Sequence, residues 1–242
     1  MTSREPLVRC VDVTRIFGSG PAEVVAVRHA TCEVHAGDRI AITGPSGSGK
    51  STLLHMLGAL ERPTAGDVTW PGLRGDPLAN PGQIGTVFQA PSLLPPLDVR
   101  ENVALPLLIS GDVADLELRV ETALQALGVE QLGRQLPEEL SGGQAQRVAV
   151  ARVLAMAPVL ILADEPTGQL DAEHGRRVID ALMETAHRLG AALVVATHDE
   201  KIADRFLVRW TVDDGQVLVG VNRPTDDAPE PRSTVEGPAS WH

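Results

Sequence analysis

The strongest chemical signal in this chain is a glycine-rich octad that ends in a lysine and a serine. The octad follows a short apolar run at 39–43 and leads into a helical pattern, and it reads Gly44, Pro45, Ser46, Gly47, Ser48, Gly49, Lys50, Ser51. Gly-x4-Gly-Lys-Ser in that context predicts a phosphate-binding loop, in which backbone N–H groups and the lysine hold phosphate oxygens. Ser51 is the expected Mg²⁺ ligand, and Thr52 completes the predicted nucleotide site. The alternative is a glycine-rich turn before a helix.

A pair of carboxylates supplies a second signal. Asp164 and Glu165 follow an apolar run at 159–163, which is typical of a buried strand. Phosphate-loop sites lie at the carboxyl edge of such sheets. We therefore expect Asp164 to hold Mg²⁺, usually through water, and Glu165 to orient or deprotonate the water that attacks the γ phosphorus. The alternative is a solvated acidic turn.

A second glycine-rich segment, Leu140 to Gln144, ends twenty-one residues before Glu165. Ser141 and Gln144 match a capping box that opens a helix running to about residue 157. Capping alone requires no glycine, and Gly142 and Gly143 cost roughly 1 kcal/mol each relative to alanine in a helix. That cost is understandable if bare N–H groups approach an anion closely. The segment lies too far along the chain to serve the same nucleotide as the phosphate loop, so we expect another molecule to complete the site.

With these segments the chain resembles the ATP-binding cassette (ABC) ATPases, over roughly residues 7–221, with each nucleotide motif present once and in family order. The resemblance implies that Ser141 and Gly143 contact the γ phosphate of ATP held by the phosphate loop of a second copy. Two copies would then face head to tail around two ATP molecules. The implied fold is an α/β P-loop NTPase core with a mainly parallel sheet, an N-terminal antiparallel β subdomain and an α-helical subdomain.

Four further residues gain roles from the resemblance. Gln89 matches the Q-loop glutamine, which senses Mg²⁺ and the attacking water and connects to a membrane partner; alone it would be a surface polar residue. His198 matches the switch histidine, a γ-phosphate sensor that also holds Glu165 and the water. Asp171 matches the D-loop residue that links the two composite sites, with helix N-capping as the alternative. Phe17 lies where the family places an adenine-stacking aromatic, with a core phenylalanine as the alternative.

Positioning these residues requires an α/β domain, which the alternation of β-branched runs with helical patterns predicts. The expected strands are 7–13, 31–34, 39–43, 67–70, 84–88, 159–163, 192–196, 207–212 and 217–221, and the expected helices are 50–60, 99–109, 115–127 and 141–157. We expect one ABC ATPase domain over 1–221, with its core at 1–88 and 159–221 and a helical subdomain at 89–158. Residues 222–242, rich in Pro, Asp and Glu, are expected to be a disordered tail, or alternatively a partner-binding one.

Composition limits the possible partners. The chain has 242 residues, is 43% hydrophobic and carries a net charge of −11, so it can bury a large core and lacks the basic footprint of a nucleic-acid binder. No run approaches the roughly 20 apolar residues of a membrane span, and the N-terminus lacks a signal-peptide core, so we expect a cytoplasmic protein. Cys10 and Cys32 are expected to be buried and reduced.

Within the family, the runs at 89–95, 99–103 and 163–171 resemble the macrolide-export and lipoprotein-release type of ATPase. Two features depart from it: 70–83 is short and rich in Pro and Gly where those relatives carry a basic helical stretch, and Gln169 replaces their usual asparagine. The resemblance implies an ATP-hydrolysing subunit that drives a separate transmembrane permease from the inner face of the membrane. The alternative is a soluble or cell-division ABC ATPase that transmits force without moving a solute.

Overall fold

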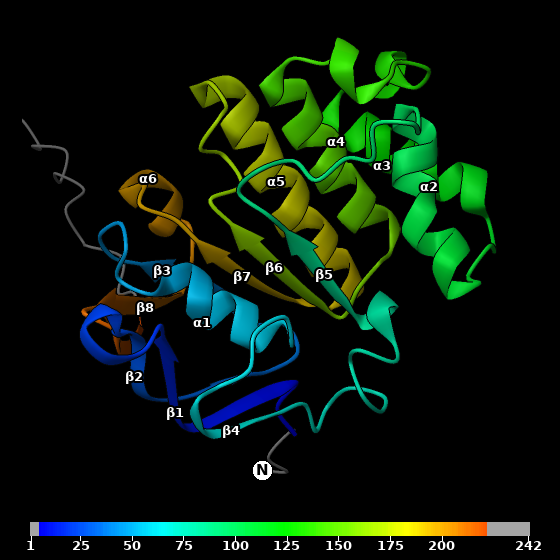
Figure 1. The fold of residues 1–242 in the computed structure, drawn as a ribbon. Coiled ribbons are helices and arrows are strands. Elements are labelled where there is room, and N and C mark those ends of the chain that lie inside the picture. Colours follow the sequence, from blue (N-terminus) through cyan, green and yellow to red (C-terminus); the bar gives the residue numbers. More distant parts are fainter. Residues whose placement is uncertain (1–4, 222–242) are drawn as a thin grey trace, which may run out of the picture.

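The computed structural model describes residues 5–221, and in that range a nine-stranded sheet runs in the order β4-β1-β2-β9-β8-β3-β7-β6-β5 (Figure 1). The strands are β1 (Val8–Phe17), β2 (Val24–Val34), β3 (Arg39–Thr43), β4 (Ala65–Thr69), β5 (Ile84–Val87), β6 (Leu160–Asp164), β7 (Ala192–Ala196), β8 (Val208–Asp213) and β9 (Gln216–Val221). The helices are α1 (Lys50–Leu57), α2 (Val99–Ser110), α3 (Leu116–Leu127), α4 (Gly142–Ala155), α5 (Ala172–Leu189) and α6 (Glu200–Ala203). Short 3₁₀ helices lie at Gly20–Ala22, Pro81–Gln83, Glu130–Leu132 and Pro137–Glu139.

The parallel half of the sheet comprises β8, β3, β7, β6 and β5. Every residue of β6 and β7 is buried, as parallel strands covered on both faces require. Alternate side chains of these strands enter two different cores. One core packs Leu162 and Val194 against α1, and the other packs Ile161 and Val195 against α5 and the helices α2 to α4.

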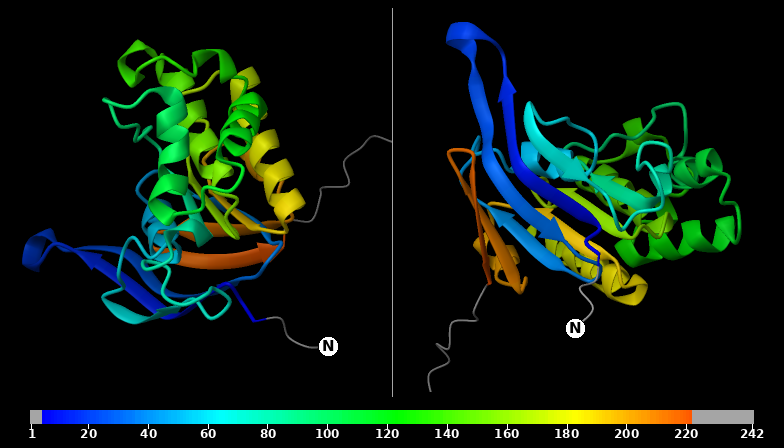
Figure 2. Two further views of the ribbon diagram at one scale, coloured as in Figure 1. Left: turned by 90° about the vertical axis from the view of Figure 1, so that its right-hand side faces the viewer. Right: turned by 90° about the horizontal axis from the view of Figure 1, so that it is seen from below.

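The N-terminal strands form an antiparallel unit, in which β1 pairs with both β2 and β4. Figure 2 shows the far end of the β1–β2 hairpin extending away from the rest of the fold. The predicted strands 7–13 and 31–34 were therefore too short. Beyond Val13 most residues of the hairpin are only partly buried, so it lacks the regular buried alternation by which a strand is recognised in sequence. Within the hairpin, Cys10 lies directly opposite Cys32, and both are buried free thiols.

The interval 89–158 contains α2, α3 and α4, which form the group at the upper right of Figure 1. Helix α2 begins with a capping box between Asp98 and Glu101 and continues through Pro106, as predicted. Helix α3 ends at Gly128, whose φ of 60° is left-handed. The core under these helices is continuous with the core under α5, so the division into a core and a helical subdomain stays a prediction.

Helix α5 was missing from the sequence-based assignment. Its buried residues Val178, Ile179, Leu182 and Ala186 form one stripe among charged neighbours, and Asp171 caps its start. Within residues 5–221 no helix is long and apolar enough to span a membrane. The predicted tail at 222–242 lies outside the described residues.

Candidate functional site

The phosphate loop joins β3 to α1 and is pressed between two other strands. A Cβ added at Gly44 would lie 2.1 Å from the carbonyl oxygen of Val212, and one at Gly49 would lie 2.0 Å from that of Ala26. Both glycines also have left-handed φ angles, 145° and 110°. The loop therefore needs glycine at both ends, because no side chain fits there and L-residues rarely adopt these angles.

Lys50 is buried, and its Nζ donates hydrogen bonds to the carbonyl oxygens of Gly44 (2.8 Å) and Pro45 (2.9 Å). The helix it begins has no side-chain cap and no acidic residue in its first turn. The first N–H groups of such a helix, together with its dipole, favour an anion. An ammonium group and an uncapped helix N-terminus thus lie at one loop, as phosphate binding requires.

Asp164 is the last residue of β6 and Glu165 follows it, at the edge of the sheet where β3 and β7 also end. Asp164 pairs with Ala196 of β7, and Ala196 pairs with Ile42 of β3, so the phosphate loop begins at the level of the two carboxylates. Asp164 is 5% exposed, and its Oδ1 has no hydrogen-bond partner among residues 5–221. An unpaired buried carboxylate oxygen is costly, so this atom suits a cation or a water bound to one.

Glu165 is held in an unusual backbone conformation. Its φ is 45°, a region that costs a non-glycine residue about 1–3 kcal/mol. Two backbone hydrogen bonds maintain this strained conformation, one from Glu165 N to the Ala196 oxygen (2.9 Å) and one from Gly168 N to the Glu165 oxygen (3.1 Å). Its Oε2 lies 2.9 Å from Nδ1 of His198, which follows β7 and is 72% exposed at its side chain. The carboxylate is thereby fixed with one oxygen engaged by the imidazole.

Gln89 is exposed two residues beyond β5, whose Val87 is level with Ala163 of β6. The backbone around it is attached to α4. Gln146 Nε2 donates to the Phe88 carbonyl oxygen (3.1 Å), and Arg152 Nη1 donates to that of Ser92 (2.8 Å). A movement of α4 would therefore move this segment with it.

The segment 141–144 has the predicted capping box. Gln144 N donates to Ser141 Oγ (3.3 Å), and Ser141 N donates to Gln144 Oε1 (2.8 Å). The glycines have a further cause that sequence reasoning did not identify. A Cβ at Gly142 would lie 3.2 Å from Gln169 Oε1, and one at Gly143 would lie 3.0 Å from Leu170 Cδ2. The close approach of residues 169–170 therefore accounts for part of the need for small residues here.

Asp171 acts as the N-cap of α5, which was the alternative to its D-loop role. Its Oδ1 accepts hydrogen bonds from the N–H groups of Glu173 (3.0 Å) and His174 (2.9 Å), and its Oδ2 lies 2.6 Å from His174 Nδ1. The backbone and then the side-chain hydrogen bonds of His174 hold the pKa of Asp171 below its ordinary value. The cap leaves this exposed carboxylate at the surface formed by 169–171 and 142–143.

Phe17 ends β1 and is 38% exposed, so it is not a core phenylalanine. It pairs with Val24 of β2, and two residues further along β2 the Ala26 carbonyl meets Gly49 of the phosphate loop. The ring thus lies on the strand pair that contacts the phosphate loop. Such a ring can stack on a nucleotide base.

The structure gathers most of the predicted site at one edge. These residues follow parallel strands that end together, except Asp164, which is the last residue of β6; they are 44–52, Glu165, His198 and Gln89. The segment 141–144 is separate: among residues 5–221 no hydrogen bond joins it to the phosphate loop. Within residues 5–221, the two segments predicted to bind phosphate are therefore not joined by any hydrogen bond.

Two buried polar residues of α4 were not predicted. Gln146 is 1% exposed and Arg147 is 8% exposed, and Arg147 Nη1 donates to the carbonyl oxygens of Leu127 and Gly128 at the end of α3 (both 3.1 Å). Burial lowers the pKa of Arg147. The sequence feature that could have revealed them is the presence of two long polar side chains on the buried face of a predicted helix. They connect α4 to the Gln89 segment and to α3.

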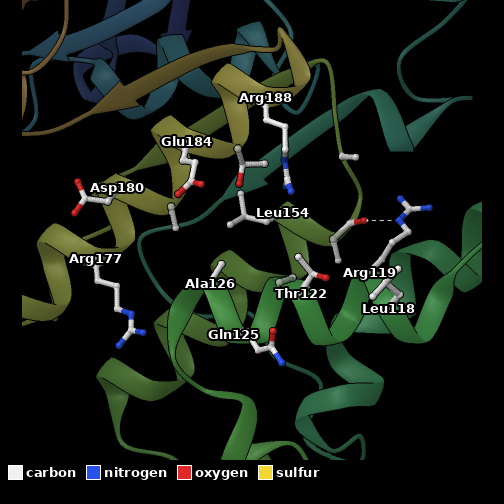
Figure 3. Close-up of a pocket in the computed structure, with 15 residues that line it drawn as sticks. Leu118, Arg119, Thr122, Gln125, Ala126, Leu154, Arg177, Asp180, Glu184 and Arg188 are labelled. Carbon is white, nitrogen blue, oxygen red and sulfur yellow. Dashed lines mark hydrogen bonds between the residues drawn. The ribbon is translucent and has the colours of Figure 1, made fainter.

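A separate pocket of about 530 Å³ lies between α3 and α5 (Figure 3). Arg119, Arg177 and Arg188 line it together with Asp180 and Glu184. Arg119 is bonded to the Ala155 carbonyl oxygen (3.0 Å). None of the predicted site residues lines this pocket, so it is distinct from the edge that holds the phosphate loop.

Comparison with known proteins places this geometry in context. The family model described as ABC transporter matches residues 27–168. An uncharacterized ABC transporter ATP-binding protein of Thermotoga maritima is 41% identical over 222 residues, which cover 87% of this chain and 93% of that protein. The lipoprotein-releasing system ATP-binding protein LolD of Shewanella denitrificans is 41% identical over 211 residues, covering 84% and 91%.

Solved structures agree with the sequence relatives. The ATP-binding cassette MJ0796, solved as a dimer in a post-hydrolysis state bound to ADP and Pi, superposes with a TM-score of 0.81 at 35% identity. The match covers 89% of this chain and 99% of that one. The similarity therefore extends over the phosphate loop, the acidic pair and the segment 141–144 together.

Proposed function

Because this chain belongs to the family of ABC transporter ATP-binding proteins and is an ATP-binding ATPase of that type, we propose that two copies close head to tail around two ATP molecules and drive a separate transmembrane permease. The observation that carries the catalytic part is the Glu165–His198 hydrogen bond beside the unpartnered Asp164, at the edge where the phosphate loop begins. The individual residue roles below belong to the same proposal.

The phosphate loop and α1 bind the triphosphate. Lys50 exchanges the carbonyl oxygens of Gly44 and Pro45 for oxygens of the β and γ phosphates, and the N–H groups of the loop hold the rest. The nucleotide site consists of Gly44, Pro45, Ser46, Gly47, Ser48, Gly49, Lys50, Ser51 and Thr52, with Phe17 under the adenine. The exposure of Phe17 and the contact of its strand pair with Gly49 support that placement.

Glu165 orients the attacking water and takes its proton. One carboxylate oxygen is occupied by His198, which leaves the other for the water, and the strained but well-anchored backbone keeps the group in place. His198 keeps its exposed Nε2 for the γ phosphate.

The residues at this edge fit Mg²⁺ better than a metal held by protein alone. Residues 5–221 contain no cluster of three or more His, Cys, Asp or Glu side chains that could hold a metal. Mg²⁺ in nucleotide sites uses one or two protein oxygens, water and the phosphates. Ser51 and Asp164 are the proposed ligands, together with Gln89, which follows β5 at the same edge of the sheet. When bound, Mg²⁺ neutralises charge on the β and γ phosphates.

The second copy supplies the other half of each site. Ser141 is exposed, and 141–144 makes no hydrogen bond to the phosphate loop of its own chain among residues 5–221, which supports binding to the loop of a partner. Asp171 adjoins this segment through residues 169–170 and would contact the partner as well. The similarity to a cassette solved as a dimer with ADP and Pi is in accord with this arrangement.

A permease would bind beside Gln89. A groove of about 310 Å³ is lined by Phe88, Leu105 and Pro106, and by Leu60 and Ile109, which are 50% and 71% exposed. Its apolar character suits a short amphipathic helix from the cytoplasmic side of a membrane protein. The hydrogen bonds from α4 to residues 88–92 would carry the closure of the helical subdomain to that helix. The chain would thereby lie on the inner face of the membrane.

The shared site is tested by complementation. Lys50→Ala chains should lose ATP affinity, and Ser141→Arg chains should bind ATP but fail to dimerise. A mixture contains one intact composite site, built from the phosphate loop of the Ser141→Arg chain and the 141–144 segment of the Lys50→Ala chain. We expect an ATP-dependent heterodimer on gel filtration of the mixture. If the mixture stays monomeric with ATP, the site is not shared between copies.

A further inference from the structure

Arg15 lies against the Phe17 ring. Its guanidinium carbon Cζ is 4.3 Å from the ring centroid, the distance of a cation–π contact. The guanidinium lies over one face of the ring, and Phe17 as a residue is 38% exposed. One face of Phe17 is therefore backed by a cation, and the residue still keeps part of its surface accessible.

The guanidinium is itself held by the segment that follows α1. Arg15 Nη2 lies 3.0 Å from Glu61 Oε1, and Nη1 donates to Thr64 Oγ1 at 3.3 Å. The side chain of Arg15 is 24% exposed, and Nε is buried without a partner among residues 5–221. Arg15 is thus fixed through its outer nitrogens, with its guanidinium carbon over the ring.

This arrangement ties the ring to the helix of the phosphate loop. Helix α1 begins at Lys50, and just after its end the N–H of Glu61 donates to the His55 carbonyl oxygen (3.3 Å). At the other end of that helix, Gly49 meets the Ala26 carbonyl, two residues from Val24, the partner of Phe17. Phe17 is therefore connected through these contacts to both ends of α1, the helix that follows the phosphate loop.

We propose that Arg15 is a positioning residue for the nucleotide base. It backs one face of Phe17 and fixes the ring, so that the opposite face stacks on adenine at a set distance from the phosphate loop. An exposed phenyl ring changes rotamer on the ps–ns timescale, and ordering it on binding has an entropic cost. Arg15 removes part of that cost before ATP arrives. The inference rests on the proposed stacking role of Phe17.

The test compares ATP with inorganic tripolyphosphate, which has the phosphates but no base. Both affinities are measured by calorimetry on the full chain. Phe17→Ala should weaken ATP binding by about 5-fold or more, the loss of one base–aromatic stack. Arg15→Gln should weaken it by about 2- to 5-fold, which corresponds to the ~0.5–1 kcal/mol of an exposed cation–π contact. Neither variant should change tripolyphosphate affinity, and Arg15→Gln should have no further effect in the Phe17→Ala background.

A matched control lies on the same strand. Arg9 also forms an ion pair, with Glu33 at 2.7 Å, but it is far from the ring. Arg9→Gln should leave both affinities unchanged. Arg15→Lys keeps a cation without the flat face and should fall between wild type and Arg15→Gln. Glu61→Gln loosens the anchor while keeping the guanidinium, and should have a smaller effect than Arg15→Gln.

The outcomes separate the two proposals. If Phe17→Ala binds ATP with unchanged affinity, Phe17 does not stack on the base. The proposed role of Arg15 is then overturned as well. If Phe17→Ala weakens ATP binding but Arg15→Gln leaves ATP affinity unchanged, only the positioning role of Arg15 is overturned. Equal losses for ATP and tripolyphosphate in Arg15→Gln would mean that Arg15 supports the fold and not the base, and would also overturn it.

Discussion

Glu165 and His198 stand 33 residues apart in the chain, yet their side chains are joined by a 2.9 Å hydrogen bond across the ends of β6 and β7. The register of the two strands creates this pair, because Asp164 is level with Ala196 and each partner follows within two residues. The carboxylate is 12% exposed and the imidazole 72%, so one member is sheltered and the other is open to solvent.

Replacing Glu165 with glutamine keeps the shape of the side chain and removes its ability to accept a proton. We expect ATP hydrolysis to fall at least about 100-fold, the typical contribution of a general base, while ATP affinity stays the same. Steady-state ATPase assays and calorimetry measure the two quantities. Glu117→Gln is the matched control, because Glu117 is 91% exposed on α3. Near-normal turnover in Glu165→Gln would remove this residue from its assigned role.

His198→Ala should lower turnover about 10-fold or more with little change in ATP affinity, because a carboxylate that loses its anchor is misplaced for attack. The double variant with Glu165→Gln should be no slower than Glu165→Gln alone, since both changes disable one unit. His187→Ala, an exposed histidine near the end of α5, is the control. Additive losses in the double variant would show that the two residues act independently.

Gly49→Ala should abolish nucleotide binding and lower stability, because the new Cβ would lie 2.0 Å from the Ala26 oxygen at a φ of 110°. Gly37→Ala is a sharp control: its φ is also positive, at 86°, but no atom lies within 4 Å of the added Cβ. Gly37→Ala should therefore cost only the backbone strain of about 1 kcal/mol. Urea unfolding with ATP titration distinguishes them. Equal behaviour of the two variants would contradict the close packing of the loop.

Asp171 makes a pH-dependent contribution to stability. Its pKa in the folded state is held below the ordinary 3.8, first by the backbone hydrogen bond from His174. The stabilisation is therefore fully present above the ordinary pKa and is lost as the pH falls through the folded-state pKa. The difference in free energy of unfolding between wild type and Asp171→Asn should shrink below about pH 4. A difference that stays flat with pH for Asp171→Asn would refute the effect.

Cys10 and Cys32 should be inert in the native protein. The hydrogen bond that the Cys32 thiol shares with Cys10, and then burial, raises the pKa of Cys32, and only the thiolate reacts with disulfide reagents. Ellman's reagent at pH 8 should therefore label neither thiol in the folded chain and both after unfolding in guanidinium. Rapid labelling of the folded chain would show that the β1–β2 pair opens readily.

The parts of the site that could be predicted are those in which a short run carries both its chemistry and its local fold. The phosphate loop is one such run, because glycine spacing, Lys50 and the strand before it are contiguous. Asp164 and Glu165 are another, since an entirely apolar strand precedes them. Parallel strands ending together then place them at one edge without further information.

The parts that could not be predicted depend on contacts between distant segments. The outer half of the β1–β2 hairpin is mostly only partly buried and lacks a regular alternation of buried and exposed residues. The role of Arg15 depends on its contacts with Glu61 and Phe17, and that of Gln146 depends on its hydrogen bond to the Phe88 carbonyl oxygen. The glycines at 142 and 143 have a structural cause, contact with 169–170, that no local pattern contains.

The central claim is that each ATP is enclosed by the phosphate loop of one copy and residues 141–144 of the other. Light scattering on Glu165→Gln measures this most directly. We expect the mass to double when ATP is added, and to stay that of one chain when Ser141→Arg is present as well, although ATP still binds. A chain that remains monomeric with ATP bound, or a dimer that forms equally well with Ser141→Arg, would contradict the account.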